Sequence, residues 1–246
     1  VKNPLAPNLI FGVDPMELIP VIDQRIKKAK ANLKGTGKRI QSNTHVMEGT
    51  VLSHPFTVAD LKSNEDNQEK YIAWRNDMIR YAIEDATKRG LETLSVVEHL
   101  DESHPHIHVL SVPRLTNNNP RLDAKNCHPG HKASKLSLAN GSHAKESMLA
   151  YKNAMKKWQD DIWQNVSTKH GLTRIGPRKR RLTRSEWSKQ KDAAQQLQES
   201  IKHKQLIENE LKDLQTTLKE NELLKRDVTN LQTSLDALKR EYSHFR

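Results

Sequence analysis

The sequence predicts an α+β fold, in which an antiparallel sheet carries helices on one face and is followed by a C-terminal coiled-coil helix. Two β-rich runs, 92–98 and 105–113, flank a short polar turn, as neighbouring strands of one sheet do. Apolar residues at three- and four-residue steps indicate helices at 65–89 and 143–169. From residue 185 on, Gly and Pro are absent and apolar residues recur every three or four positions, which predicts the coiled coil.

The segments before the first long helix are less regular. Residues 15–32 are expected to form a short helix that the Gly35–Gly37 pair ends. Residues 44–53 are expected to form a strand, although its alternation is imperfect and Gly49 indicates a bulge. This strand would add to the sheet formed by the two later runs.

The two long helices are predicted from apolar stripes, and Gly90 and Gly171 are expected to end them. Between them, residues 114–141 are rich in Asn, Pro, Lys, His and Gly and are expected to form one long loop, of a length that is often functional. The stripes consist of Tyr71, Trp74, Met78 and Tyr81 in the first helix and Met148, Tyr151, Met155, Trp158, Ile162 and Val166 in the second.

Composition divides the chain into a domain at 1–180 and a helical tail at 185–246, separated by the basic segment "GPRKRR" at 176–181. The tail carries an a/d seam of apolar residues from Leu197 onward, and the phase slips near Asn221–Leu224. A single helix cannot bury such a seam by itself. We therefore expect it to pair with a second copy, fold back, or dock on a partner protein. A solvated charged helix is the alternative.

Charge and cysteine content narrow the class of protein. The 246 residues carry a formal net charge of +11, which favours a polyanionic partner, most often nucleic acid, over a merely basic surface. Cys127 is the single cysteine, so no intrachain disulfide can form and a reducing compartment, the cytoplasm, is expected. No apolar run is long enough to span a bilayer.

The turn "HLDESHPHIH" at 99–108 concentrates metal-ligand side chains. His106 and His108 are two apart on a predicted strand, so both imidazoles point to one face. His99 and Glu102 lie just upstream, where an antiparallel return would bring them alongside. This set suits Mn²⁺, Zn²⁺ or another first-row ion, whereas three nitrogen donors make Mg²⁺ alone unusual. A histidine-rich surface turn without metal is the alternative.

The longer stretch "EHLDESHPHIHVLSVP" resembles the metal-binding motif of the MobV/Pre family of plasmid mobilisation relaxases, in the HUH endonuclease superfamily. The resemblance covers roughly residues 35–180. The tail resembles the family only in its type of structure, a coiled coil. It implies a metal-dependent DNA transesterase that nicks and rejoins one strand at a plasmid transfer origin through a covalent 5′-phosphate link, for conjugative mobilisation. It also implies a metal, with Mn²⁺ the first expectation, held by His99, His106 and His108. Glu102 would be a fourth ligand, an orienter of a histidine, or a proton acceptor.

The chain differs from the family in the residue that would act as nucleophile. The family's nucleophile is a His or Tyr near the N-terminus, but this chain has no histidine before His45 and no tyrosine before Tyr71. The family's N-terminal strand and nucleophile motif are therefore expected to be missing.

Two other functions remain open. Replication initiators of the same superfamily keep a nucleophilic Tyr on a later helix, which would make Tyr151 catalytic in a rolling-circle initiator or a transposase. Tyr151 also falls on the apolar stripe, so core packing is its alternative role. A non-catalytic, sequence-specific DNA-binding regulator is the other candidate.

Two basic groups are expected to contact single-stranded or hairpin DNA at such an origin, because phosphate contacts come mainly from Lys and Arg. The first group lies in the expected loop beside the metal site, and the second lies at the domain junction, where solvated linker charge is the alternative. The groups are Arg114, Arg121, Lys125, Lys132 and Lys135, and Arg178, Lys179, Arg180 and Arg181.

Overall fold

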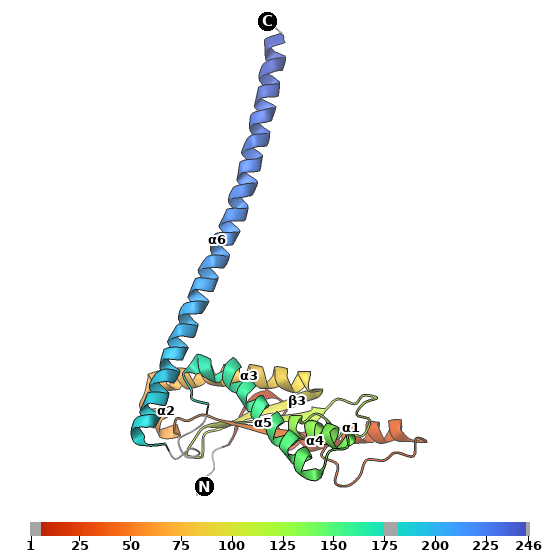
Figure 1. Ribbon diagram of the computed structural model, residues 1–246. Helices are drawn as coiled ribbons and strands as arrows, with labels where there is room; N and C mark the ends of the chain where they lie inside the picture. Colours follow the sequence, from red (N-terminus) through yellow and green to blue (C-terminus); the bar gives the residue numbers. More distant parts are fainter. Residues whose placement is uncertain (1–5, 175–181, 245–246) are drawn as a thin grey trace.

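The computed structural model describes residues 6–174 and 182–244, and it confirms the α+β class with a four-stranded antiparallel sheet (Figure 1). In chain order the elements are β1 (Asn8–Gly12), η1 (Pro15–Glu17), α1 (Leu18–Leu33), β2 (Glu48–Ser53), α2 (Val58–Ser63), α3 (Glu65–Lys88), β3 (Leu91–His99), β4 (His106–Pro113), η2 (Ala124–Asn126), α4 (Pro129–Ala139), α5 (Ala144–Asn165), η3 (Ser167–His170) and α6 (Arg184–His244).

The hairpin of β3 and β4 forms the centre of the sheet, whose strand order is β1-β3-β4-β2. Its register places His99 opposite His106, and the pairing of β2 with β4 places Val51 opposite His108. Because paired residues in an antiparallel ladder share a face, these four side chains lie on one side of the sheet.

The opposite side of the sheet forms the core. Leu52, Val96, Ile107 and Val109 are buried there, together with side chains from α3 and from the end of α5. The main partners from the helices are Tyr71, Trp74, Met78, Ile79, Ile162 and Val166. The prediction that helices cover one face is therefore confirmed.

The face that carries the histidines has little cover over its edge strands. Leu9 of β1, paired with Val97, is 46% exposed, and Val51 of β2, paired with His108, is 56% exposed. Solvent can therefore reach the edges of this face next to the histidines.

Three elements were not predicted. All five residues of β1 are exposed, so the strand shows no alternating pattern. The six-residue helix α2 is too short for a periodic signal, although Thr57 and Asp60 form a capping box at its start. The loop expected at 114–141 contains α4, in which Pro129 occupies the first turn and the His128 ring accepts a hydrogen bond from the backbone N–H of His131 at 3.3 Å.

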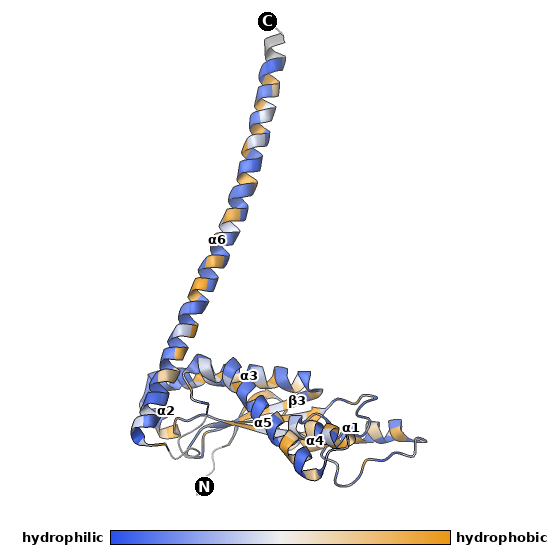
Figure 2. Ribbon diagram, viewed as in Figure 1, coloured by the Kyte–Doolittle hydropathy of each residue, from blue (hydrophilic) through white to orange (hydrophobic). Residues whose placement is uncertain are grey.

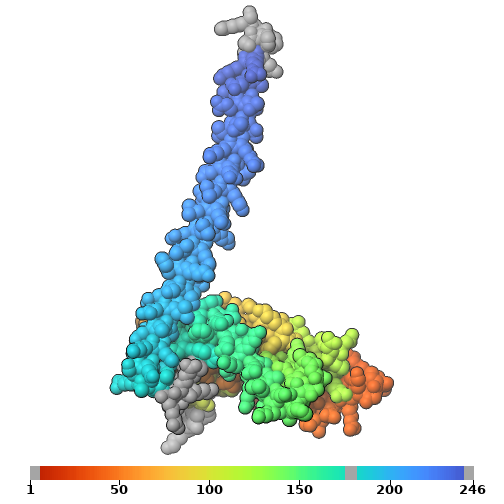
Figure 3. Space-filling model, in the orientation of Figure 1, coloured from red at the N-terminus to blue at the C-terminus, as the bar shows by residue number. Residues whose placement is uncertain are grey.

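The tail is one continuous helix that leaves the globular part and extends away from it (Figures 1 and 3). Its first turns contact η3, where the side-chain amide of Gln198 donates to the Lys169 carbonyl at 3.0 Å. From residue 202 to residue 240 every side chain is exposed. None of the described helices combines the length and apolar character needed to cross a bilayer.

Candidate metal centre

Three histidines converge at the end of the β3–β4 hairpin. The ring centres of His99, His106 and His108 are separated by 5.1 Å (His99 to His106), 4.9 Å (His99 to His108) and 5.0 Å (His106 to His108). The strand register produces this triangle, because His99 is paired directly with His106 and His108 follows two positions later on the same face. We refer to these three residues as the histidine triad.

The spacing of the triad fits a shared metal ion. With a metal–nitrogen distance of ~2.1 Å, each imidazole centre lies ~3.2 Å from the ion, and a near-tetrahedral arrangement then separates the ring centres by ~5 Å. The three observed separations of 4.9 to 5.1 Å match that value.

The orientation of the three rings is a separate matter from the spacing of their centres. In the described part of the chain, no set of three or more His, Cys, Asp or Glu side chains has its donor atoms gathered around an ion position. The planes of His99 and His106 are parallel to within 2°.

Two of the rings have an oxygen beside Nδ1. His106 Nδ1 lies 3.2 Å from the carbonyl oxygen of His104, and His99 Nδ1 lies 3.6 Å from Oδ1 of Asp101. That carboxylate oxygen is buried and has no hydrogen-bond partner. The His104 carbonyl is within hydrogen-bond distance, and an oxygen in that position orients a ligating imidazole, whereas Asp101 is close to His99 but beyond that distance. Asp101 was not predicted as a site residue.

Glu102 occupies a different position from Asp101. Its side chain is exposed, and its charge opposes the lowering of the His108 pKa. That pKa is lowered first by burial and then by the neighbouring rings of His99 and His106. The His108 ring is therefore neutral at neutral pH, the form in which an imidazole donates a lone pair to a metal. His104, the remaining histidine of the motif, points its Nδ1 at the Phe56 carbonyl oxygen, 2.9 Å away.

A buried carboxylate supports β3 on the core side, directly before His99. The Glu98 side chain is 3% exposed and accepts hydrogen bonds from the Tyr71 hydroxyl at 2.7 Å and from Arg75 at 3.2 Å. It also accepts one from the Asn8 side-chain amide at 3.1 Å. Burial, followed by the hydrogen bond to Glu98, raises the pKa of Tyr71, so this hydroxyl stays protonated and acts as a donor. The network ties β1 and α3 to the strand that carries His99.

Tyr151 lies at the other end of the sheet from the histidine triad. Its ring centre is 5.7 Å from that of His128 and 5.3 Å from that of His131, and it packs against Gly130. Cys127, just before His128, contacts the carbonyl of Gly90, next to the end of the sheet where β3 begins. The eight residues from His106 to Pro113 span ~23 Å. The structure therefore does not bring Tyr151 to the triad.

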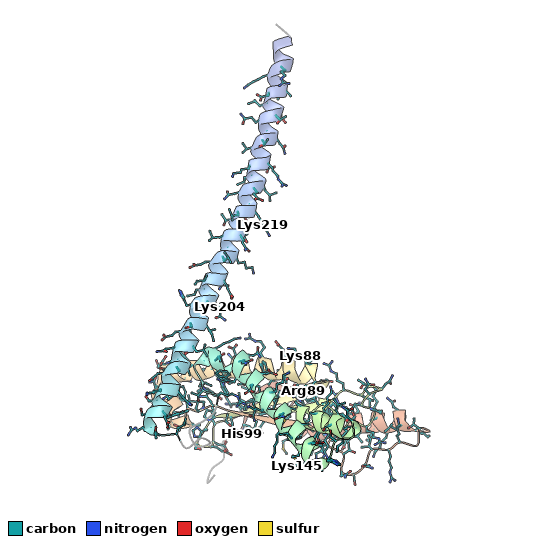
Figure 4. The ribbon with its side chains drawn as sticks, in the orientation of Figure 1. Lys88, Arg89, His99, Lys145, Lys204 and Lys219 are labelled. Atoms are coloured by element: carbon teal, nitrogen blue, oxygen red, sulfur yellow. The ribbon has the colours of Figure 1, made fainter. Side chains whose placement is uncertain are left out.

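The basic residues expected beside the metal site also lie at that far end, because the segment that contains them follows β4. The prediction that they adjoin the histidines is wrong for this reason, although all five are exposed: Arg114, Arg121, Lys125, Lys132 and Lys135. Arg114 lines an open groove of about 550 Å³ with Arg25 and Lys28 of α1. In Figure 4, Arg89, which follows α3 just before β3, and His99, the last residue of β3, are labelled at separate places on the globular part. The junction residues Arg178, Lys179, Arg180 and Arg181 lie outside the described residues.

Comparison with known proteins gives no relative: no protein-family model, no curated protein and no solved structure matches the chain.

Proposed function

We propose that this chain contains the metal-binding domain of a DNA relaxase that nicks and rejoins one strand at a plasmid transfer origin. The observation that carries the proposal is the histidine triad, with three ring centres about 5 Å apart on the open face of the sheet. A net charge of +11 supports a polyanionic substrate. We place the protein in the cytoplasm, where its lone cysteine stays reduced.

The residues of the site have distinct roles in this proposal. His99, His106 and His108 would hold the ion, the His104 carbonyl would orient the His106 ring, and Asp101 would lie beside the His99 ring. A bound Mn²⁺, or Zn²⁺ in its place, would supply positive charge to the nonbridging oxygens of the scissile phosphate. Glu102, exposed near His108, would accept a proton at the rim of the site.

The position of Tyr151 weighs against the alternative of a replication initiator or transposase. Its hydroxyl lies near the far end of a strand that is ~23 Å long, too far to attack a phosphate held at the triad of the same chain. The proposed nucleophile is therefore not Tyr151; it is either a His or Tyr of the N-terminal motif that the family resemblance implies, or another residue of this chain. A DNA-binding regulator without nicking activity remains distinguishable by experiment.

A nicking assay tests the proposal. Supercoiled plasmid DNA and labelled single strands are incubated with this chain and with an N-terminally extended form, in Mn²⁺ or in EDTA. We expect the extended form to nick in Mn²⁺ only, and His106→Ala to abolish nicking. His104→Ala is the matched control, because His104 lies in the same motif but is exposed and points away from the triad.

The outcomes separate the alternatives. Cleavage that survives both EDTA and His106→Ala would refute the metal mechanism. Specific DNA binding without nicking by the extended form would identify a regulator. Cleavage by the present chain that Tyr151→Phe abolishes would favour the initiator.

A further inference from the structure

The exposed part of α6 carries a continuous apolar seam that nothing in the described structure covers (Figure 2). The side chains along it are between 49% and 70% exposed over the two segments on either side of Asn221. The seam consists of Ile207, Leu211, Leu214, Leu218, Leu224, Val228, Leu231, Leu235 and Leu238. Apolar residues at alternating three- and four-residue steps form the a and d positions of a coiled coil.

The seam is separate from the surface by which α6 docks on the globular part. The docked turns place half-buried side chains at Trp187, Gln190, Ala194, Gln198 and Ile201. Ile201 was predicted as part of the seam, but the structure assigns it to the docked surface. The exposed apolar seam begins six residues later, at Ile207. Its three- and four-residue steps do not continue those of the docked side chains. Docking therefore leaves the seam available to a partner.

We propose that this seam pairs with a second copy of the chain in a parallel, in-register coiled coil. Folding back is excluded for the described tail, because α6 runs without a break from Arg184 to His244. A second copy in register also places Asn221 opposite its own counterpart. The heptad pattern of both helices then shifts at the same height along the coil. The apolar positions of the two copies therefore stay opposite one another before and after Asn221.

The charges flanking the seam select the parallel orientation. With Val228 and Leu235 at a positions, the e positions hold Lys225, Gln232 and Lys239, and the g positions hold Glu220, Asp227 and Ser234. A parallel pair brings each g residue to the e residue five positions later in the partner, so that Glu220 meets Lys225 of the second copy.

The antiparallel orientation would bring together side chains of like charge. It pairs e with e and g with g, which places Lys against Lys and acidic residues against one another. The e positions of this segment include no acidic residue, and the g positions include no basic residue. The parallel orientation contains no like-charged pair among these residues and therefore fits better.

This pairing determines where the two globular parts lie. Both would stand at the Arg184 end of the coil, whose exposed part, residues 202–240, is ~57 Å long at 1.5 Å per residue. The two histidine triads would then face one DNA target from the same end of the dimer. The dimer does not depend on the proposed nicking function, and its test is independent of that function.

Cross-linking distinguishes the orientations. Single cysteines are introduced as Leu211→Cys and Leu231→Cys, and the full chains are treated with a short bismaleimide, alone and mixed. Wild type provides the background, because its Cys127 is buried. We expect each variant to cross-link to itself, and the mixture to give no linkage between positions 211 and 231. Linkage only in the mixture would indicate an antiparallel pair centred on Asn221 and overturn the proposal. A monomer without cross-links would also overturn it.

A charge substitution provides a second test. Ser234→Lys places a lysine at g, opposite Lys239 of the second copy, and we expect the dimer dissociation constant to rise about threefold or more, since two like-charged surface pairs are created. Thr233→Lys is the matched control. It adds the same charge one position away, at the outward f position, and both hydroxyls make the same bond to a carbonyl four residues earlier. Equal effects of the two variants in sedimentation equilibrium would contradict the predicted orientation.

Discussion

His54 and His106 lie at the same end of the sheet, but they belong to opposite faces. His54 is 4% exposed and packs in the core against the rings of Phe56, Tyr71 and Trp74, with ring centres 4.7, 5.5 and 4.8 Å away. Its Nδ1 accepts a hydrogen bond from the Phe56 backbone N–H, so it is satisfied as a neutral ring. His106 instead faces two other histidines on the opposite side of the sheet.

The face of the sheet, and not the residue type, therefore decides whether a histidine packs in the core or faces other histidines. On the core side, burial lowers the pKa of His54 to about 4, and aromatic rings occupy the space around it. On the open side, three rings gather at ~5 Å, a spacing that suits an ion better than it suits packing. Substitutions of residues on the two faces of the sheet test this difference between the core side and the histidine side.

Ile107 lies between the two strand histidines but points to the core, where it is fully buried. Ile107→Ala should lower the free energy of unfolding by about 4 kcal/mol, because it removes buried methylenes and leaves a cavity. Urea unfolding followed by circular dichroism would measure this. A loss below about 1 kcal/mol would show that the core does not lie on this face.

His54 should make stability depend on pH. Its pKa is lowered from 6.5 to about 4 in the folded chain, mainly by burial, so the unfolded chain binds more protons between these values. Stability is therefore fully present above pH 6.5 and is lost as the pH falls towards 4, by about 3 kcal/mol over the whole window. Unfolding at a series of pH values, with wild type compared with His54→Asn, would isolate this contribution. An unchanged pH slope in the variant would argue against it.

Glu98 supports the histidine strand from the core side. Glu98→Gln should cost about 2 kcal/mol of stability, because it removes a charged acceptor from Tyr71 and Arg75 in a buried setting. Glu92→Gln is the matched control on the same strand. Its ion pair with Arg25 is partly solvated, with the Glu92 side chain 46% exposed, so its loss should cost less than about 1 kcal/mol. Equal losses of stability for the two variants in thermal unfolding would show that the buried network around Glu98 stabilises the fold no more than the partly solvated pair does.

The smallest expected effect on stability comes from the triad itself. His108→Ala should change the free energy of unfolding by less than about 0.5 kcal/mol, because its ring lies on the open face and is not part of the core. The same urea titration used for Ile107→Ala would measure it. A loss of several kcal/mol would mean that the triad is a packing cluster.

The elements predicted correctly are those whose pattern is long and regular. The helices α3 and α5 follow stripes that include Trp74 and Ile162, and β3 and β4 follow β-rich runs on either side of the motif. The strand β1 and the helix α2 are short, and one exposes all its residues, so periodicity carries no signal for them. The first turn of α4 was concealed by Pro129 and Gly130, residues that are more typical of loops.

The three triad residues were predicted because alternation on a strand places His106 and His108 together regardless of the surrounding fold. Asp101 was missed because its contact with His99 depends on how the turn between β3 and β4 bends. The basic residues from Arg114 onward were expected beside the site because they are near it in sequence. The chain instead leaves the far end of β4, and this could be recognised only from the direction of the strand.

The most direct test is a Mn²⁺ titration of the full chain, with free Mn²⁺ followed by electron paramagnetic resonance. We predict a single tight site in wild type and in His104→Ala, and loss of that site in His106→Ala. Indistinguishable Mn²⁺ binding by wild type and His106→Ala, or no binding by wild type, would contradict an ion held between these three rings.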